Sequence, residues 1–274
     1  MKVMSIFKNR IFTAMAGVAV LLFMSVSLSS CDVASNKDKG TFKVVMFDAP
    51  GDYDEVWVHI SRVEVNNSAD AETGWVVISE PNERYNLLEL VNGANVVLGE
   101  ADLEEGTYEQ IRLILGSDNN IVIGEDSFPL MVPSGQQTGI KLNVNAEIIA
   151  GITYTLLLDF DAQRSVVKQG ATGSYALQPV IRAMNEALTG NITGTVDPAV
   201  EGAWVRALSG DEVVATTQTV ETGEFTIVGL FDGFYTVTID AGEDFEPFEQ
   251  TGVEVKIGQV TDLNTIELTA VPTE

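Results

Sequence analysis

"GITYTLLLDFD", residues 151–161, is the stretch that decides the fold of this chain. Side chains alternate between the two faces of a β-strand, so every second residue of the stretch shares a face. One face carries the large residues Ile152, Tyr154, Leu156, Leu158 and Phe160. The other face carries Thr153, Thr155, Asp159 and Asp161. We therefore predict a strand whose apolar face lies in a core and whose polar face is reached by water or by another side chain.

The same period of two recurs from Thr41 onward, in short segments separated by Gly, Pro and Asn residues. "VWVHI", residues 56–60, alternates, but its parity slips near Ser61, which predicts a bulge or a bend. One helical turn is predicted in "NLLELVNG", residues 86–93, which ends in a glycine. Many short strands at regular spacing predict an all-β fold of the sandwich type.

A change of pattern near "NEALTG", residues 185–190, divides the chain. We predict one all-β domain over residues 41–186 and a second β-sandwich over residues 188–274. "LEEGTY", residues 103–108, and "LFDGFY", residues 230–235, share the pattern L-x-x-G-x-Y and each precedes a strand. The glycine permits a positive φ in the turn, and we expect the leucine and the tyrosine to pack on either side of the bend. The repetition favours one recurring sandwich turn.

Three basic residues precede an apolar stretch at residues 11–28. That order is typical of a secretory signal peptide, although the stretch is also just long enough to suggest a membrane span. "LSSC", residues 28–31, follows and resembles the lipobox of bacterial lipoproteins, in which the signal is cut before a cysteine that is lipidated. We therefore predict a signal peptide over residues 1–30, a lipidated Cys31 and a tether over residues 31–40.

The lipobox resemblance implies a chain that lipid holds at a bacterial membrane. Cys31 is the only cysteine, so no disulfide can form within the chain and the fold must rest on its core. Two or more acyl chains make a firm anchor, because each buried methylene contributes ~0.8 kcal/mol. We expect attachment to the outer membrane, facing either the periplasm or the exterior.

The chain is strongly acidic, with 15 basic residues, 40 acidic residues and a formal net charge of −25. Removal of the predicted signal peptide takes away three basic residues and no acidic residue, so the charge of −25 becomes −28. A negative charge of this size repels nucleic acid and anionic membrane surfaces and attracts cations. We therefore predict that nucleic acid is not a partner.

Six segments of the first domain resemble the domain of unknown function 4382, which is common in lipoproteins of Bacteroidota-type bacteria. They are "VVMFDAPGDYDEVWVHISRVEV", "YNLLELVNG", "EEGTYEQIRLIL", "PLMVPSGQQTGIKL", "LLLDFDAQRSVVKQG" and "LQPVIRA". In the second domain, "GTV", "TGEFTIVGLFDGFYTVTI" and "VEVKIGQVTDLNTIEL" resemble carboxypeptidase regulatory-like domains, with a transthyretin- or Cna-B-like sandwich. The first resemblance implies no established activity, and the second implies a spacer or accessory module.

Asp159 and Asp161, at the end of the quoted strand, form the first candidate site. Two carboxylates at positions i and i+2 of a strand lie roughly 7 Å apart. Together with the acidic loop that begins at Asp48, they could hold a calcium ion through oxygen ligands. The favoured alternative is a structural network, in which Asp161 caps its own turn and an arginine neutralises Asp159. Arg112, which points away from the core, and Arg164 are the arginines expected there.

No motif in the sequence indicates catalysis. His59 is the only histidine, and it alternates within a strand without a partner for base or ligand chemistry. The sequence has no G-x-S-x-G, H-E-x-x-H, phosphate-loop or EF-hand motif. A carboxylate-dependent hydrolase stays a distant alternative, because glycoside hydrolysis needs only two such groups. We predict a protein that is not an enzyme, with no cofactor and no metal.

Three tryptophans, Trp57, Trp75 and Trp204, are candidates for a ligand platform, because an indole offers a broad apolar face and a polar edge. Trp204, just before "VRAL" in the second domain, is the preferred one. The hypothesis is a cell-envelope lipoprotein that binds a glycan or a protein partner. The alternative is a purely structural envelope or adhesin subunit whose domains act as spacers.

Overall fold

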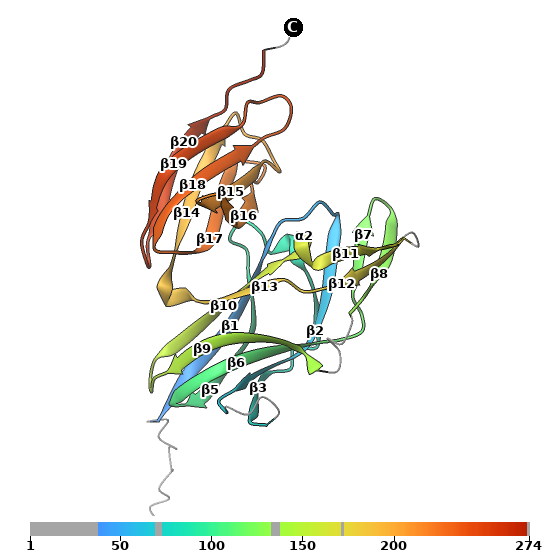
Figure 1. The fold of residues 1–274 in the computed structure, drawn as a ribbon, viewed down its shortest axis with the longest axis vertical. Coiled ribbons are helices and arrows are strands. Elements are labelled where there is room, and N and C mark those ends of the chain that lie inside the picture. The colour runs from blue at the N-terminus through green and yellow to red at the C-terminus, as the bar shows by residue number, and fades with distance from the viewer. Residues whose placement is uncertain (1–37, 69–72, 133–137, 171–172, 273–274) are drawn as a thin grey trace, which may run out of the picture. The chain divides into compact units, whose positions relative to one another are not determined.

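The structure is a computed structural model that describes residues 38–68, 73–132, 138–170 and 173–272. The predicted signal peptide and Cys31 lie outside these residues. Within the described part of the chain, no helix is long and apolar enough to cross a membrane. The regular structure there is almost entirely β-strand, in two sandwiches that follow one another along the chain, so the predicted fold class is confirmed (Figure 1).

Strands β1 to β13 build the first sandwich. Their bounds are β1 Lys39–Ala49, β2 Glu55–Asn66, β3 Trp75–Ser79, β4 Glu83–Asn86, β5 Val96–Glu104, β6 Gly106–Leu115, β7 Asn120–Ile123, β8 Asp126–Met131, β9 Ile140–Ile148, β10 Thr153–Asp161, β11 Val166–Gln169, β12 Ser174–Leu177 and β13 Ile181–Asn185. Short helical turns interrupt them at η1 Leu87–Glu89 and α2 Ala162–Ser165.

Two sheets enclose the core of the first sandwich. One has the strand order β13-β10-β1-β5, and the larger one runs β11-β12-β8-β7-β2-β6-β9, with β3 and β4 paired to β2. β1 and β10 are parallel neighbours in the middle of the smaller sheet (Figure 1). Apolar side chains from both sheets share one core, in which Phe42, Ile60, Ile111 and Phe160 are completely buried. This core is built without any disulfide, as the single cysteine requires.

Strand β10 buries both of its faces, which differs from the prediction. Leu158 and Phe160 point into the core as predicted. On the opposite face, Leu157 and Asp159 are only 5% and 9% exposed, because a second layer covers the face that was expected to meet water. Ile152 is 55% exposed and lies in the turn before β10, not on its core face.

Two local predictions from the sequence are confirmed. The register of β2 against β6 shifts between Ile60 and Arg62, which places a bulge at the slip in parity near Ser61. The predicted helical turn in residues 86–93 is the single 3-10 turn η1. Both features follow from short-range pattern, because a bulge adds one residue to a strand and so reverses the alternation after it.

Strands β14 to β20 build the second sandwich. Their bounds are β14 Thr189–Asp197, β15 Trp204–Ser209, β16 Glu212–Gln218, β17 Glu224–Phe231, β18 Gly233–Asp240, β19 Phe248–Val255 and β20 Val260–Glu267. One sheet has the order β17-β14-β20 and the other β16-β15-β18-β19. A separate apolar core, which includes Val205, Phe225, Val237 and Ile266, fills the space between them. The 3-10 turn η3, Glu186–Leu188, is all that separates β13 from β14.

The two L-x-x-G-x-Y segments form the same local structure, one in each sandwich. The hydroxyl of Tyr108 donates to the carbonyl of Glu104 at 3.4 Å, and the hydroxyl of Tyr235 donates to the carbonyl of Phe231 at 2.8 Å. Each tyrosine therefore ties the bend to a carbonyl four residues upstream. The leucine of each segment is also buried, as expected for a recurring turn.

The outer face of β1 and β10 packs against the second sandwich through a small apolar cluster. Its members are Val45, Phe47, Leu157 and Met184, with Val228 of β17 packed against them. Beside it, the side chain of Asn92 accepts a hydrogen bond from the backbone N–H of Thr226 and donates one to the carbonyl of Glu224 at 3.4 Å. The edge strand β17 thus finds partners on the first sandwich, which is why this face of β10 is buried.

Candidate functional site

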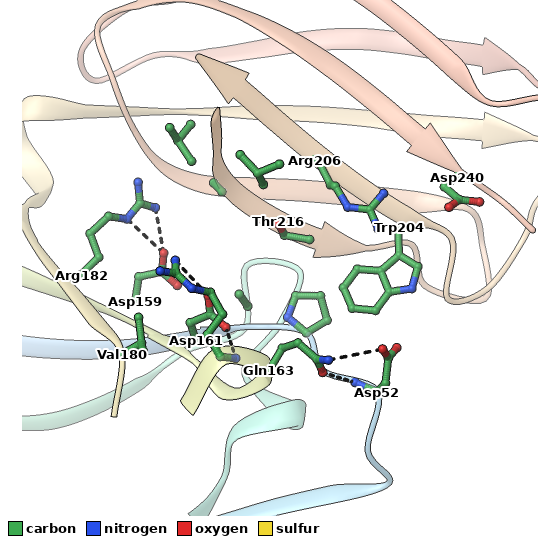
Figure 2. Close-up of a pocket in the computed structure, with 16 residues that line it drawn as sticks. Asp52, Asp159, Asp161, Gln163, Val180, Arg182, Trp204, Arg206, Thr216 and Asp240 are labelled. Carbon is green, nitrogen blue, oxygen red and sulfur yellow. Dashed lines mark hydrogen bonds and ion pairs between the residues drawn. The ribbon is translucent and has the colours of Figure 1, made fainter. Parts of the chain in front are cut away.

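A groove of about 580 Å³ opens where β1 and β10 end, beside strands β15 and β16 of the second sandwich (Figure 2). The polar and aromatic side chains that line it are Asp52, Asp159, Asp161, Gln163, Arg164, Arg182, Trp204, Arg206, Thr216 and Asp240. We call it the Trp204 groove. It brings three of the predicted site residues, Asp159, Asp161 and Arg164, together with the preferred tryptophan, which is 40 positions further along the sequence.

Asp159 is held by Arg182 on the neighbouring strand. The two residues are directly opposite one another in the antiparallel pair of β10 and β13. Nε and Nη2 of Arg182 both donate to Oδ2 of Asp159, at 3.1 and 2.8 Å. Burial raises the pKa of Asp159 above its ordinary value of 3.8, although the charge and hydrogen bonds of Arg182 oppose the shift. Two charge-assisted bonds to one oxygen fix this carboxylate in place.

Asp161 begins helix α2 and serves as its cap. Its Oδ1 accepts a hydrogen bond from the backbone N–H of Arg164 at 2.8 Å, and its Oδ2 lies 3.8 Å from Nη1 of the same residue. The side chain of Arg164 is 71% exposed, so this ion pair adds little stability. The cap is the turn motif that the sequence predicted, and Arg164 is the arginine predicted beside it.

Asp48, the third carboxylate of the predicted site, is not among the residues that line the groove. It is only 3% exposed, and its Oδ1 accepts a hydrogen bond from the backbone N–H of Ala162 at 2.9 Å. Its Oδ2 is buried and has no hydrogen-bond partner among the described residues. Burial raises the pKa of Asp48 well above 3.8, the bond from Ala162 opposes this, and the charges of Asp159 and Asp161 add to it. Asp48 therefore keeps its proton to a higher pH than an ordinary aspartate.

These contacts engage one oxygen of each carboxylate that a calcium ion would need. Ca²⁺ takes six to eight oxygen ligands, whereas one oxygen of Asp159 already receives a guanidinium and each of Asp48 and Asp161 caps a backbone N–H. In the part of the chain that the structure describes, no group of three or more His, Cys, Asp or Glu side chains is arranged to hold a metal ion. The geometry fits an aspartate–arginine network.

Trp204 stands at the start of β15 and is half-buried. Figure 2 shows its indole projecting into the groove on the side of Asp52 and Gln163. The backbone N–H of Asp52 donates to Oε1 of Gln163 at 2.7 Å, and Nε2 of Gln163 lies 3.4 Å from Oδ2 of Asp52. The guanidinium of Arg206 lies 5.4 Å from the centroid of the indole. An aromatic face, an amide and a carboxylate are thus held around one opening.

The other two tryptophans lie outside the groove, and each, like Trp204, has an arginine over its ring. The guanidinium of Arg84 is 5.0 Å from the ring centroid of Trp57, and that of Arg112 is 4.1 Å from the centroid of Trp75. Arg112 also forms an ion pair with the buried Glu64. The prediction that Arg112 neutralises Asp159 is therefore wrong, because Arg112 belongs to β6 in the other sheet of the sandwich.

Asp52 belongs to the acidic loop Asp48 to Glu55 that the sequence had indicated, whereas no motif marks three further residues of the groove, Gln163, Arg182 and Asp240. Alternation in "IRAMN", residues 181–185, would have put Arg182 on one face with Met184, but only the sheet order makes β13 the neighbour of β10. The other two lie in or beside turns, where alternation gives no direction. His59 takes no part in this groove, and its Nε2 lies 3.1 Å from Oδ1 of Asn82.

The matches to known protein families coincide with the two sandwiches. The family described as the domain of unknown function DUF4382 matches residues 39–179, slightly more than half of the chain. The chain belongs to this DUF4382 family. The carboxypeptidase regulatory-like domain matches residues 187–269. The predicted order of a DUF4382 domain followed by a carboxypeptidase regulatory-like domain is therefore confirmed. No curated protein matches the sequence.

Solved structures resemble the DUF4382 chain only distantly. A chain in a type II cohesin–X-dockerin complex of Acetivibrio cellulolyticus is 20% identical, with a TM-score of 0.25, over 30% of this chain and 58% of that one. A candidate carbohydrate-binding protein of Bacteroides uniformis is 21% identical, with a TM-score of 0.23, over 31% and 42% of the two chains. The minor pilin GBS52 of Streptococcus agalactiae is 9% identical, with a TM-score of 0.25, over 85% and 98%. This chain spans less than two thirds of the length of the first two proteins. TM-scores this low carry no argument about function.

Proposed function

We propose that the protein is a lipid-anchored component of the bacterial outer membrane that binds a neutral saccharide in the Trp204 groove without catalysing a reaction. The observation that carries this proposal is the indole of Trp204 beside the held amide of Gln163 and carboxylate of Asp52. The C–H face of a pyranose packs on an aromatic ring, while a carboxylate accepts hydrogen bonds from its hydroxyls and an amide both accepts and donates them.

The size of the groove supports a small ligand. Sites for small molecules enclose about 300–1,000 Å³ and combine apolar surface with a few fixed polar groups. The Trp204 groove, at about 580 Å³, lies within that range and has room for one or two sugar rings. Its apolar lining includes Trp204 and Val213 and Val214 of β16.

The charge of the groove supports a neutral ligand. The guanidinium of Arg182 neutralises Asp159, and that of Arg164 lies beside Asp161. The guanidinium of Arg206 lies over the indole of Trp204. Within the described residues, Asp52 and Asp240 are then the carboxylates of the groove that form no ion pair with an arginine. An anionic ligand would meet these two groups in a chain of net charge −25, so electrostatics disfavours it.

The same contacts disfavour the hydrolase alternative. A general acid must reach the oxygen it protonates, and the oxygen of Asp159 that Arg182 holds lies in a side chain only 12% exposed. Asp48 has the raised pKa that suits an acid, but its buried carboxyl caps Ala162. The remaining carboxylates, those of Asp52 and Asp240, are suited to accept hydrogen bonds from sugar hydroxyls.

Array binding followed by titration tests the binding part of the proposal. The mature protein in detergent is applied to immobilised neutral oligosaccharides, and the tightest one is titrated by isothermal titration calorimetry, whose signal does not depend on Trp204. Trp204→Ala should weaken binding by about tenfold or more, as removal of a central aromatic anchor does. Trp57→Ala is the matched control and should bind like the wild type. Equal affinity in Trp204→Ala would show that the saccharide binds outside the Trp204 groove, whereas no binding by a folded wild type would favour a structural spacer.

The lipobox residues 28–31 support the anchor, and labelling of cells with a fatty-acid analogue tests it. Cys31→Ser should abolish incorporation of the label and leave an uncleaved precursor, while the two sandwiches still fold. Label that persists in Cys31→Ser would show that the lipid is attached elsewhere.

A further inference from the structure

Four large apolar side chains are exposed around a second groove, of about 390 Å³, between the start of β10 and the second sandwich. They are Ile152 at 55% exposure, Leu188 at 51%, Phe231 at 48% and Val260 at 59%. We call these four residues the apolar rim. Exposed apolar residues scattered singly need no explanation, whereas a cluster marks a surface that meets another apolar phase.

The strand register brings the members of the rim together. Phe231 is paired with Thr189, the residue after Leu188, and Val260 is paired with Asn191 on the same strand. Val260 also lines the second groove with Thr153, which follows Ile152. Leu157 and Val228, which belong to the apolar cluster between the sandwiches, also line this groove.

The described chain begins beside this rim. The backbone N–H of Thr41 donates to the carbonyl of Ile152 at 3.0 Å, and that of Gly151 donates to the carbonyl of Lys39 at 2.9 Å. Cys31 precedes Lys39 by eight positions, which an extended chain spans in at most roughly 28 Å. A lipid on Cys31 would thus hold a bilayer surface within that distance of Ile152.

The Trp204 groove lies at the other end of the same strands. It is lined by Ala49 and Asp161, the last residues of β1 and β10, whereas Ile152 of the apolar rim directly precedes the first residue of β10. The eleven residues of β1 rise by roughly 33 Å in all. A bilayer that contacts the apolar rim therefore leaves the Trp204 groove open to solvent.

We propose that the apolar rim rests on the lipid surface and orients the anchored protein, so that the Trp204 groove faces away from the membrane. This inference rests on the lipid anchor of the proposed function. The anchor is required because four side chains offer little apolar area and the chain carries a net charge of −25. The partner of the rim is thus the bilayer in which the lipid of Cys31 is embedded.

A site-specific fluorescent probe tests the orientation. Acylation consumes the only native cysteine, so a cysteine introduced at Val260 can be labelled alone with an environment-sensitive dye. Val213→Cys is the matched control, because Val213 is 45% exposed and lines the Trp204 groove. The lipidated protein is placed in vesicles of phosphatidylethanolamine and phosphatidylglycerol, with or without a quencher attached to the lipid chains.

The dye at position 260 should emit at shorter wavelength in vesicles and be quenched several-fold more than the dye at position 213. Leu188→Cys should repeat the result from a different element. Equal emission and quenching at positions 260, 188 and 213, in protein that sediments with the vesicles, would overturn the orientation and leave the anchor intact. Protein that does not sediment with the vesicles would refute the anchor and the orientation together.

Discussion

The loss of stability in Arg182→Met should measure how strongly the second layer buries Asp159. Arg182→Met keeps most of the apolar volume of the side chain and removes both donors to the carboxylate. Removing one partner of a buried ion pair costs about 3–5 kcal/mol, because the other charge stays unpaired. Asp159 is 9% exposed, but the side chain of Arg182 is 31% exposed and admits some water. We therefore expect a loss near the lower end of that range, about 3 kcal/mol at pH 8.

The loss should depend on pH in a definite direction. Burial already raises the folded-state pKa of Asp159, and Arg182 is the group that lowers it, so Arg182→Met should raise this pKa further. A carboxyl whose folded-state pKa lies above its unfolded value contributes stability that is complete below the unfolded pKa and disappears as pH rises through the folded one. The difference between Arg182→Met and the wild type should therefore shrink as the pH falls from 8 toward 5.

Urea unfolding at pH 5 and pH 8, followed by circular dichroism, measures both effects. With a slope of about 2–3 kcal/mol per molar, the loss corresponds to a midpoint lower by about 1–1.5 M at pH 8. The double variant Asp159→Leu with Arg182→Met should recover most of it, because no unpaired charge is left. Arg164→Met is the control and should cost below about 1 kcal/mol, since its ion pair is exposed. A loss in Arg182→Met as small as that of the control, or equal at both pH values, would refute the reasoning.

Three further outcomes are expected. The folded-state pKa of Asp48 is raised, so its contribution to the free energy of unfolding is lost as the pH rises from 4 to 8, and Asp48→Asn should flatten that decline. Asp211→Asn, which changes an exposed turn residue, is the control and should leave the decline unchanged. Melting curves with calcium and with a chelator should superimpose, whereas a calcium-dependent rise that Asp159→Asn with Asp161→Asn abolishes would restore the calcium site. Residues 188–274, expressed alone, should give a dispersed β-rich amide spectrum, since their core is separate, and a collapsed spectrum would show that this core needs the first sandwich.

Local pattern predicted the elements well and their partners poorly. The slip in parity near Ser61 locates a bulge, and the L-x-x-G-x-Y segments locate two equivalent tyrosine contacts. The arginine of Asp159 was expected to be Arg164 or Arg112, which alternation also turns away from the core. Alternation specifies a face within one strand and contains no information on which strand lies beside it. Arg112 therefore meets Glu64 across β2 and β6.

The sequence by itself determined the all-β fold, the core face of β10 with Leu158 and Phe160, and the cap at Asp161, because each depends on residues a few positions apart. Only the tertiary structure decided that the other face of β10 is covered, and that Asp159 meets Arg182, 23 positions away. It also decided that Trp204 lines the same groove as Asp159. The physical reason is that these contacts depend on the order of strands in a sheet and on the packing of one sandwich against another. Both are set by the sum of many distant contacts, which no short stretch of sequence contains.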